Sequence, residues 1–418
     1  MTEARHAIET VFRIERVRLI GSLARLVRDL DQAEELAQDA LVAALAEWPE
    51  RGIPERPGAW LLATARRRAI DGFRRRRMLA RRHAEIGWDL RLAGEAGPEG
   101  IEAALDDDLG DERLGLIFAA CHPLLPPEAR VALTLRLIGG LTVDEIARAF
   151  LATEAAIAQR IVRAKRLLGR AGIRYEVPRG AEREERLPSV LEVIYLIFNE
   201  GYAASAGEDL IRPALCAEAR RLGRILSGLL PDEPEVCGLL ALMELQASRL
   251  AARTAPDGAP VPLTEQNRAR WDRLLIRRGL AALERAEALG GADGPYALQA
   301  ALAACHARAA RAEETDWRRI AALYDRLRES MPSPVVELNR AIAHSMAFGP
   351  EAGLALLEGI ERTPALRAYA PLRAAKGDFL FRAGRLAEAR IWFDEAADLS
   401  RNAREKAFLR KRAADCGG

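Results

Sequence analysis

The chain has 418 residues, which is too long for one ordinary hydrophobic core and predicts two to four domains. Half of the residues are apolar, only 5% are aromatic, and Ala, Leu and Arg dominate, a composition that favours helices over strands. The net charge of +2 excludes neither acidic nor basic partners, because the charges are segregated along the chain. No segment approaches the roughly twenty apolar residues of a membrane span, so no membrane contact is expected.

Two segments concentrate positive charge and one concentrates negative charge. Residues 66–82 contain nine Arg and one acid, and residues 160–170 contain five basic residues and no acid. Residues 102–112 contain six acids and no basic residue. A single run of this kind is usually a solvated helix face, but two basic runs beside apolar stripes indicate surfaces for distinct partners.

The chemistry-bearing residues do not form a catalytic or metal-binding pattern. The five Cys and five His are scattered without zinc spacing, and no cofactor is expected. Patterns of serine hydrolases, P-loop NTPases, zinc proteases and dinucleotide-binding enzymes do not occur, which argues against an enzyme. The N-terminus is charged and lacks an apolar export segment, so we expect a cytoplasmic protein with reduced thiols.

The first part of the chain, up to Met78, predicts a small helical domain. Residues 8–27 have apolar side chains at helical spacing. Asp31 is expected to cap a second helix that Pro49 ends, with Glu34 in the capping-box position. Polar and acidic side chains, consistent with a basic partner, lie beside its apolar stripe: Glu34, Glu35, Gln38 and Asp39.

A third helix follows Pro57 and is rich in Arg. Apolar residues such as Leu61 and Phe73 can face a core, while outward positions are expected for Arg66, Arg67, Arg74 and Arg75. Such a face supplies salt-dependent contacts to phosphates. Trp60 either stacks on an unpaired base or packs in the core.

The segment Leu141–Leu168 predicts a helix-turn-helix. Thr142 is expected to cap its first helix, with Glu145 in the capping-box position, and Thr153 is expected to cap its second. A buried stripe in the second helix consists of Ile157, Ile161, Ala164 and Leu168. The remaining positions face DNA or solvent: Glu154, Ala155, Ala158, Gln159, Arg160, Arg163, Lys165 and Arg166. Gln and Arg can bond to adenine and guanine edges. An amphipathic hairpin inside a bundle is the alternative, and the Arg-rich helix upstream favours DNA binding.

These helices together resemble bacterial RNA polymerase sigma factors of the extracytoplasmic-function type. The core-binding helix of that family is similar to the segment with Asp31, Ala33, Glu34, Glu35, Leu36, Gln38, Asp39, Ala40 and Leu41. Its promoter-melting and −10 segment is similar to Trp60-Leu61, Ala65-Arg66 and Ala69-Ile70-Asp71 through Arg74-Arg75. Its −35 helix is similar to Glu145-Ile146-Ala147, Ala158-Gln159-Arg160 and Arg163-Ala164-Lys165. The chain departs from the family at Arg67-Arg68, where Asn usually follows the first Arg, and at Leu41, where Phe is common.

The resemblance implies a role for each segment and no covalent chemistry. The protein would bind core RNA polymerase at the clamp helices of its largest subunit and at its flap. The surface of this chain that docks on the clamp helices would consist of Asp31, Glu34, Glu35, Gln38 and Asp39. The −10 element of promoter DNA would be held by Trp60, Arg66, Arg67, Asp71, Arg74 and Arg75. The −35 element would be read by Thr153, Glu154, Ala158, Gln159, Arg160, Arg163, Lys165 and Arg166.

The last part of the chain predicts a large helical domain. Helices are expected at residues 188–198, 214–230, 235–252, 270–289, 297–312, 317–330 and 334–347. A tetratricopeptide-like spacing relates Gly377, Gly384, Ala389, Phe393 and Ala396, although Lys376, Leu380 and Arg401 depart from that pattern, so a divergent helical repeat is expected. FNEGY (198–202), LTEQNRARWD (263–272) and SPVVELNRAIA (333–343) resemble the C-terminal extension of one sigma subgroup, which implies regulation in cis and an unidentified regulator. Buried hydrogen-bond networks are expected for Asn199, Glu200, Gln266, Arg268, Trp271, Gln299, Asp316 and Asn339.

The sequence therefore predicts an all-α protein with three helical domains. These are residues 1–78, residues 111–173 with the helix-turn-helix, and the helical-repeat residues 187–418, joined by an acidic linker at 79–110 and a second linker at 174–186. The alternative is a helical-repeat adaptor or transcription regulator that binds DNA or protein partners without acting as a sigma factor.

Overall fold

The computed structural model describes residues 2–84, 112–150, 152–203, 211–255, 260–361, 363, 366, 369–400 and 403–417. These residues form helices, with one isolated β-bridge between Thr254 and Pro260, so the predicted all-α class is confirmed. The chain divides into two compact units, Met1–Val193 and Ile194–Gly418, and the boundary lies inside a helix.

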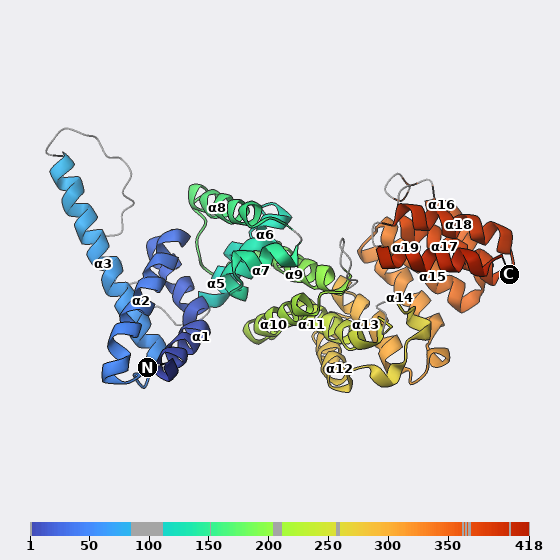
Figure 1. The fold of residues 1–418 in the computed structure, drawn as a ribbon, viewed down its shortest axis with the longest axis horizontal. Helices are drawn as coiled ribbons and strands as arrows, with labels where there is room; N and C mark the ends of the chain where they lie inside the picture. The colour runs from blue at the N-terminus through green and yellow to red at the C-terminus, as the bar shows by residue number, and fades with distance from the viewer. Residues whose placement is uncertain are drawn as a thin grey trace. The chain divides into compact units, whose positions relative to one another are not determined.

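The first unit begins with three packed helices, α1 (Thr2–Val27), α2 (Leu30–Arg51) and α3 (Pro57–Ala84) (Figure 1). The predicted N-cap of α2, Asp31, is wrong, because the helix begins two residues earlier. Asp29, in extended conformation, accepts a hydrogen bond from the Gln32 amide at 2.8 Å, so Asp31 lies inside the first turn. Pro49 also does not end α2, which continues to Arg51 before Gly52 at φ +82°.

The second part of this unit contains the helix-turn-helix. It comprises α5 (Glu112–Ala120), α6 (Pro127–Thr134), a π-helical turn (Leu135–Gly139), α7 (Val143–Ala149) and α8 (Glu154–Arg170). Thr142 and Glu145 form the expected capping box, and Thr153 accepts a hydrogen bond from the Ala156 amide. The predicted stripe of α8 is the one that is buried: Ile157, Ile161, Ala164 and Leu168.

Both predicted linkers contain helix. The Arg-rich helix α3 extends six residues beyond Met78, to Ala84, and the acidic run at 106–108 lies outside the described residues. Helix α9 (Ala181–Tyr202) begins six residues before the predicted start of the C-terminal domain at residue 187, and its first turns belong to the first unit.

The start of α9 is bonded to the helix-turn-helix part through two buried Arg. Arg186 donates to the Phe118 carbonyl at 2.9 Å, and Arg130 donates to Ser189 and to the Glu192 carboxylate, the latter at 2.8 Å. Ser189 in turn donates to a backbone carbonyl of α5's end. Because a buried guanidinium needs its acceptors, these bonds fix α9 on α5 and α6.

The described part of the second unit consists of helices that follow one another along the chain. Beyond α9 they are α10 (Pro213–Leu229), α11 (Pro234–Ala247), α12 (Arg273–Ala288), α13 (Pro295–Arg308), α14 (Trp317–Ser330), α15 (Pro334–Phe348), α16 (Pro350–Ile360), α17 (Ala370–Arg382), α18 (Leu386–Leu399) and α19 (Ala403–Asp415). Short 3-10 turns lie at η2 (Leu250–Ala252), η3 (Leu263–Glu265), η4 (Arg268–Arg270) and η5 (Ala312–Glu314). One apolar core involves α11 to α15 and another involves α15 to α19. The seven predicted helices therefore all exist, with ends shifted by a few residues.

In the helix pair α17–α18, two glycines of the predicted tetratricopeptide-like spacing have a structural reason. A Cβ on Gly377 would lie 3.0 Å from the Phe393 ring, so glycine allows the two helices to approach closely. Gly384 adopts φ +78° in the connecting turn. The pair is a packed helical hairpin, and its assignment to the tetratricopeptide class stays a prediction.

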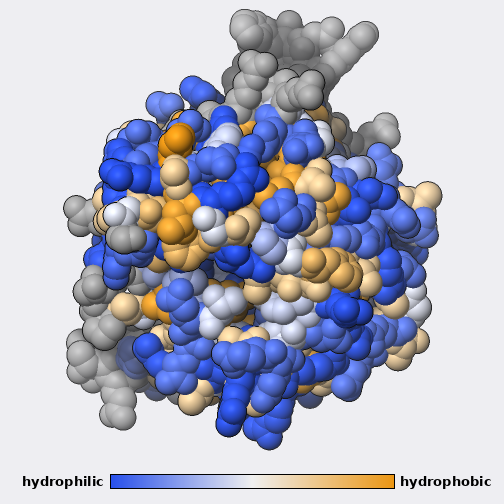
Figure 2. Space-filling view, turned by 90° about the vertical axis from the view of Figure 1, so that its right-hand side faces the viewer, coloured by the Kyte–Doolittle hydropathy of each residue, from blue (hydrophilic) through white to orange (hydrophobic). Residues whose placement is uncertain are grey.

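Hydrophilic side chains cover most of the face drawn in Figure 2, and apolar side chains form patches among them. Among the helices that the structure describes, none combines the length and apolar character required to cross a bilayer.

The bonds between α9 and Arg130 predict where the chain can be shortened. A chain ending before Leu187 loses both Ser189 and Glu192 and leaves Arg130, which is 7% exposed, without these acceptors. Because an unpaired buried charge costs about 3–5 kcal/mol, this chain should unfold at markedly lower denaturant concentration than one ending after Val193. Urea unfolding followed by circular dichroism checks this, and equal midpoints would contradict it.

Candidate polymerase and DNA interfaces

Helix α8 presents an exposed polar face opposite its buried stripe. Gln159, Arg160, Arg163 and Arg166 are exposed, and Glu154 lies exposed in the first turn after the Thr153 cap. The described residues offer Arg160 and Arg163 no ion-pair partner, so both guanidinium groups are available to an external acceptor. Ala158 is half-buried and its short side chain leaves the helix backbone accessible.

Helix α3 separates its apolar and charged residues onto two faces. Leu61, Ala65 and Ala69 are buried, whereas Arg67, Asp71 and Arg74 are exposed at spacings of four and three residues. The half-buried Trp60 belongs to the same exposed face. Its ring lies 5.2 Å from that of Trp48 in an edge arrangement, so Trp60 packs partly on the core and stays half-exposed.

Two Arg of α3 differ from the sequence-based expectation. Arg66 does not face solvent fully but is half-buried and donates to the Ser22 hydroxyl at 3.2 Å. Burial lowers the pKa of Arg66, partly offset by Glu112. Arg68, which was not among the predicted contacts, donates to the Asp39 backbone at 2.8 Å and pairs with its carboxylate at 3.3 Å. Of Arg75 only the helical backbone is described.

Helix α2 carries an acidic and polar face. Asp31, Glu35, Gln38 and Val42 recur at helical spacing and all are exposed. The described residues hold no partner for Glu35. Glu34, by contrast, is half-buried and Arg16 donates to its carboxylate at 3.1 Å.

Lys165 links α8 to α2 in the structure, and its contact with DNA stays a prediction. Its ammonium group binds the Asp31 carboxylate at 2.8 Å and also bonds to Glu34, and its side chain is only 11% exposed. Burial lowers the pKa of Lys165, but the attraction of Glu34 and Asp31 outweighs it, so the pKa is raised. We call this cluster of Lys165, Asp31 and Glu34 the α2–α8 clasp.

Other contacts hold the same two parts of the first unit together. Arg16 of α1 donates to the Arg136 carbonyl at 3.2 Å, and Arg113 donates to the Ile14 carbonyl at 3.3 Å. A Cβ on Gly21 would lie 2.4 Å from the Glu112 carbonyl oxygen, so α1 meets the start of α5 with almost no space between the backbones.

Comparison with known proteins matches the three parts of the chain separately. Residues 12–78 match sigma-70 region 2, residues 116–168 match sigma-70 region 4, and residues 186–287 match a family of unknown function. An uncharacterized protein of Rhizobium meliloti (strain 1021) is 44% identical over 401 residues, covering 94% of this chain and 92% of its own length.

The chain belongs to the extracytoplasmic-function sigma factors with a C-terminal extension. It is a sigma factor of transcription initiation whose α7–α8 pair is the DNA-binding helix-turn-helix of region 4. Sigma-70 regions 2 and 4 interact with core RNA polymerase and promoter DNA, and sigma factors are not enzymes.

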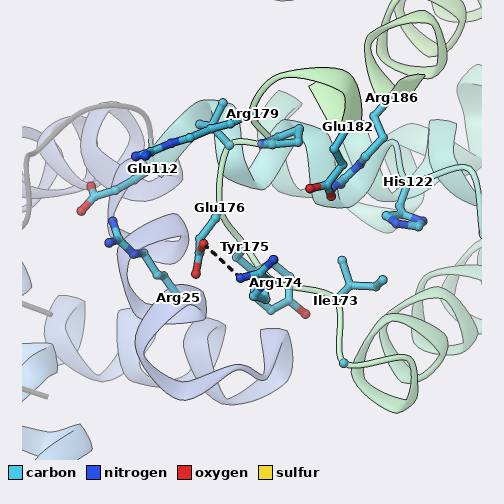
Figure 3. Close-up of a pocket in the computed structure, with 13 residues that line it drawn as sticks. Arg25, Glu112, His122, Ile173, Arg174, Tyr175, Glu176, Arg179, Glu182 and Arg186 are labelled. Atoms are coloured by element: carbon cyan, nitrogen blue, oxygen red, sulfur yellow. Dashed lines mark hydrogen bonds and ion pairs between the residues drawn. The ribbon is translucent and has the colours of Figure 1, made fainter. Parts of the chain in front are cut away.

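A groove of 850 Å³ in the first unit is not lined by any of the predicted contact residues. Figure 3 shows its charged side chains from α1, α5, α9 and the segment after α8, with Arg174 and Glu176 as an ion pair at 3.9 Å. Tyr175 in this segment is buried and its carbonyl lies where a Cβ on Gly115 would clash at 2.7 Å. The groove therefore follows from the way the segment after region 4 packs back onto α5.

The clasp was not predicted from the sequence. Lys165 was interpreted as a DNA contact because it stands beside Arg163 and Arg166, and its acidic partners lie 134 and 131 residues away. One signal was present: Lys165 is the only lysine in the first 375 residues of an Arg-rich chain. A flexible point charge suits a site shared between two carboxylates.

The clasp predicts that a charge change at Lys165 separates α8 from α2. Dyes can be attached at Val42→Cys and Val162→Cys, because both valines are exposed while all five native cysteines are buried. In this background Lys165→Glu places a third negative charge beside Asp31 and Glu34, so energy transfer between the dyes should fall.

Arg166→Glu provides the matched control, because it makes the same charge change on the exposed side of α8. Lys165→Met should give a smaller decrease, since Glu34 keeps Arg16 as a partner. Equal transfer efficiencies in the Lys165→Glu and Arg166→Glu proteins would contradict the clasp.

Proposed function

We propose that this sigma factor docks on the clamp helices of the polymerase largest subunit through the exposed face of α2, with the flap as a second contact of region 4. It holds the −10 element on α3 and reads the −35 element with α8. The observation that carries this proposal is the sorting of charge: exposed acid without a partner on α2, and exposed Arg without a partner on α8, in the two matched regions.

Fewer residues of α2 are free to contact polymerase at once than the five that the sequence predicted. Glu35 and Gln38 are exposed and without described partners, so they can meet basic groups at once. Asp31, Glu34 and Asp39 are paired within the chain, with Lys165, Arg16 and Arg68. Because ion pairs can be exchanged, polymerase would replace Lys165 at Asp31 and Glu34.

The −35 interface follows from the exposed half of α8. Thr153 and Glu154 begin the helix, and a recognition helix places its N-terminal residues against base edges. Gln159, Arg160 and Arg163 suit bidentate contacts or phosphate contacts, and Arg166 lies one turn further along. For α3, Trp60, Arg67, Asp71 and Arg74 form the exposed face for the −10 element, and Arg66 supports it from beneath through Ser22.

The clasp gives the proposal a conformational step. Lys165 cannot bind both α2 and DNA, and Asp31 cannot bind both Lys165 and polymerase. The free sigma factor would therefore hold region 4 on region 2, and binding of polymerase would release both surfaces together.

The C-terminal extension is proposed to regulate the sigma factor in cis. Helix α9 supports this, because it passes from the first unit into the second without a break and its first turns are bonded to region 4. Transcription by the full chain, compared with a chain ending after Val193, tests it: a rise indicates inhibition, a fall indicates activation, and equal activity contradicts regulation in cis.

Core binding should depend on Glu35 more than on its neighbours. Glu35→Lys is expected to weaken binding to core polymerase about tenfold or more, because it reverses an exposed charge without disturbing an internal pair. Glu50→Lys makes the same change at the exposed end of α2 and serves as the control. Titration of labelled core enzyme measures both, and equal affinities would overturn the docking surface. Absence of any new start site in run-off transcription by the unaltered chain would favour the adaptor alternative.

Promoter reading should depend on the middle of α8. Arg160→Ala and Arg163→Ala are each expected to reduce discrimination between an intact and a scrambled −35 element, by about 1–3 kcal/mol per lost base contact. Arg170→Ala at the end of the helix is the control. If the Arg160 and Arg163 variants lose activity equally on both promoters, the two side chains contact phosphates only.

A further inference from the structure

The second unit contains a cavity of 190 Å³ that the functions of regions 2 and 4 leave unexplained. It lies among α11, α13, α14 and α15, with side chains of the η3–η4 segment completing its wall. The surrounding core is dense: Leu298 and Ile320 are each 1% exposed, and Ala304 is 0% exposed. The cavity is partly open to solvent, and the packed helices around it leave it unfilled.

Aromatic rings form much of the cavity wall. Trp271, Trp317 and Tyr324 line it, and Trp317 meets the His306 ring edge-on at 5.2 Å between centroids. Such walls favour a flat, unsaturated ligand. An apolar cavity of about 150 Å³ accommodates benzene, so the space here is sufficient for one ring and a small substituent.

The wall is held in place by bonds outside the cavity. Arg268, which is 5% exposed, donates to the carbonyls of His306 and Ala309 at 2.7 and 2.8 Å and to the Thr315 hydroxyl at 2.7 Å. Its guanidinium also lies 5.1 Å from the Trp271 ring centre. The packing role expected for Arg268 is therefore confirmed, and the cavity is preorganised.

Two polar side chains that line the cavity can donate hydrogen bonds to a ligand, Arg249 and Asn339. Arg249 lines it and donates from two nitrogens to the Gln246 amide oxygen at 3.1 and 2.9 Å, an acceptor that also takes the Tyr202 hydroxyl at 2.9 Å. The described residues hold no carboxylate for Arg249, and Asn339 on α15 makes no hydrogen bond with them.

Charge in the cavity is positive and uncompensated. None of the described residues that line it is Asp or Glu, while Arg249 carries a full charge. Burial, with smaller contributions from Arg249 and Arg268, lowers the pKa of His306 to about 3, so the imidazole stays neutral at physiological pH. An arginine facing an aromatic-walled cavity without an acid is matched by a planar anion, because a carboxylate accepts two of its N–H bonds.

We infer that this cavity is a binding site for a small aromatic carboxylate, with one ring between the aromatic walls and the carboxylate on Arg249 and Asn339. The site belongs to the extension and does not depend on the proposed docking of regions 2 and 4. It gives the extension a chemical signal to respond to.

Calorimetric titration of the full chain with sodium benzoate tests the site. Benzoate should bind with a stoichiometry of one. Benzamide has the same shape without the charge and acetate has the charge without the ring, so both should bind about tenfold more weakly or less. Equal affinity for benzoate and benzamide, or no heat with benzoate at millimolar concentration, would overturn the inference.

Two variants locate the binding. Arg249→Met should weaken benzoate about tenfold and leave benzamide unchanged, whereas Arg277→Met, an exposed arginine on α12, should change neither. Ala303→Phe fills the cavity and should abolish binding of all three probes, which keeps the test decisive if loss of Arg249 disturbs folding. Binding that survives Ala303→Phe, with far-ultraviolet circular dichroism unchanged, would place benzoate elsewhere and contradict the site.

Discussion

The arrangement of the first unit depends on one half-buried lysine between two carboxylates. Lys165 is the point at which α8 of the helix-turn-helix meets α2, and its 11% exposure means that its charge has left most of its water. Removing a charge from water is costly, so Lys165 stays there only because Asp31 and Glu34 both bind it. Glu34 keeps Arg16 as a partner when Lys165 leaves, and Asp31 is 65% exposed to water, so opening strands no buried carboxylate.

The α2–α8 clasp forms because one chain carries both an acidic helix face and a basic helix face. A surface suited to a basic partner and a surface suited to DNA attract each other before either partner arrives. The close approach at Gly21 and the bond from Arg16 to the Arg136 carbonyl add contacts that do not involve the functional faces. Consequently Glu35, Arg160 and Arg163 stay exposed while the clasp is formed.

Local features were predictable because they depend on neighbouring residues. The caps at Thr142 and Thr153, the buried stripe of α8 and the helix α14 appear where the sequence indicates. The N-cap of α2 was assigned to Asp31 because Glu34 stands at the capping-box spacing from it. In the structure Asp29 is the N-cap, because Arg28 adopts φ +56° and the chain turns into the helix two residues earlier than predicted. The environments of Lys165, Arg66 and Arg249 were not predictable, since each is set by side chains from distant segments. Gln266, Arg268 and Trp271 were recognised as unusual polar and aromatic residues, but only the packing distinguishes Arg268, which supports the wall, from Trp271, which lines the cavity.

Opening of the clasp sets a thermodynamic condition on regulation. If only the open form binds polymerase through Asp31 and Glu34, the apparent affinity falls in proportion to the open fraction, so each ~1.4 kcal/mol that favours the closed form weakens binding about tenfold. Under the proposed regulation in cis, a signal in the extension would need to change the free-energy difference between the closed and open forms by only about 1.4–3 kcal/mol to control transcription. Helix α9 is suited to carry it, because Arg130 and Arg186 bind its first turns to region 4 while Tyr195, further along the same helix, packs beside the core that encloses the cavity. Under the proposed regulation in cis, a ligand that orders that core would restrict the later turns of α9.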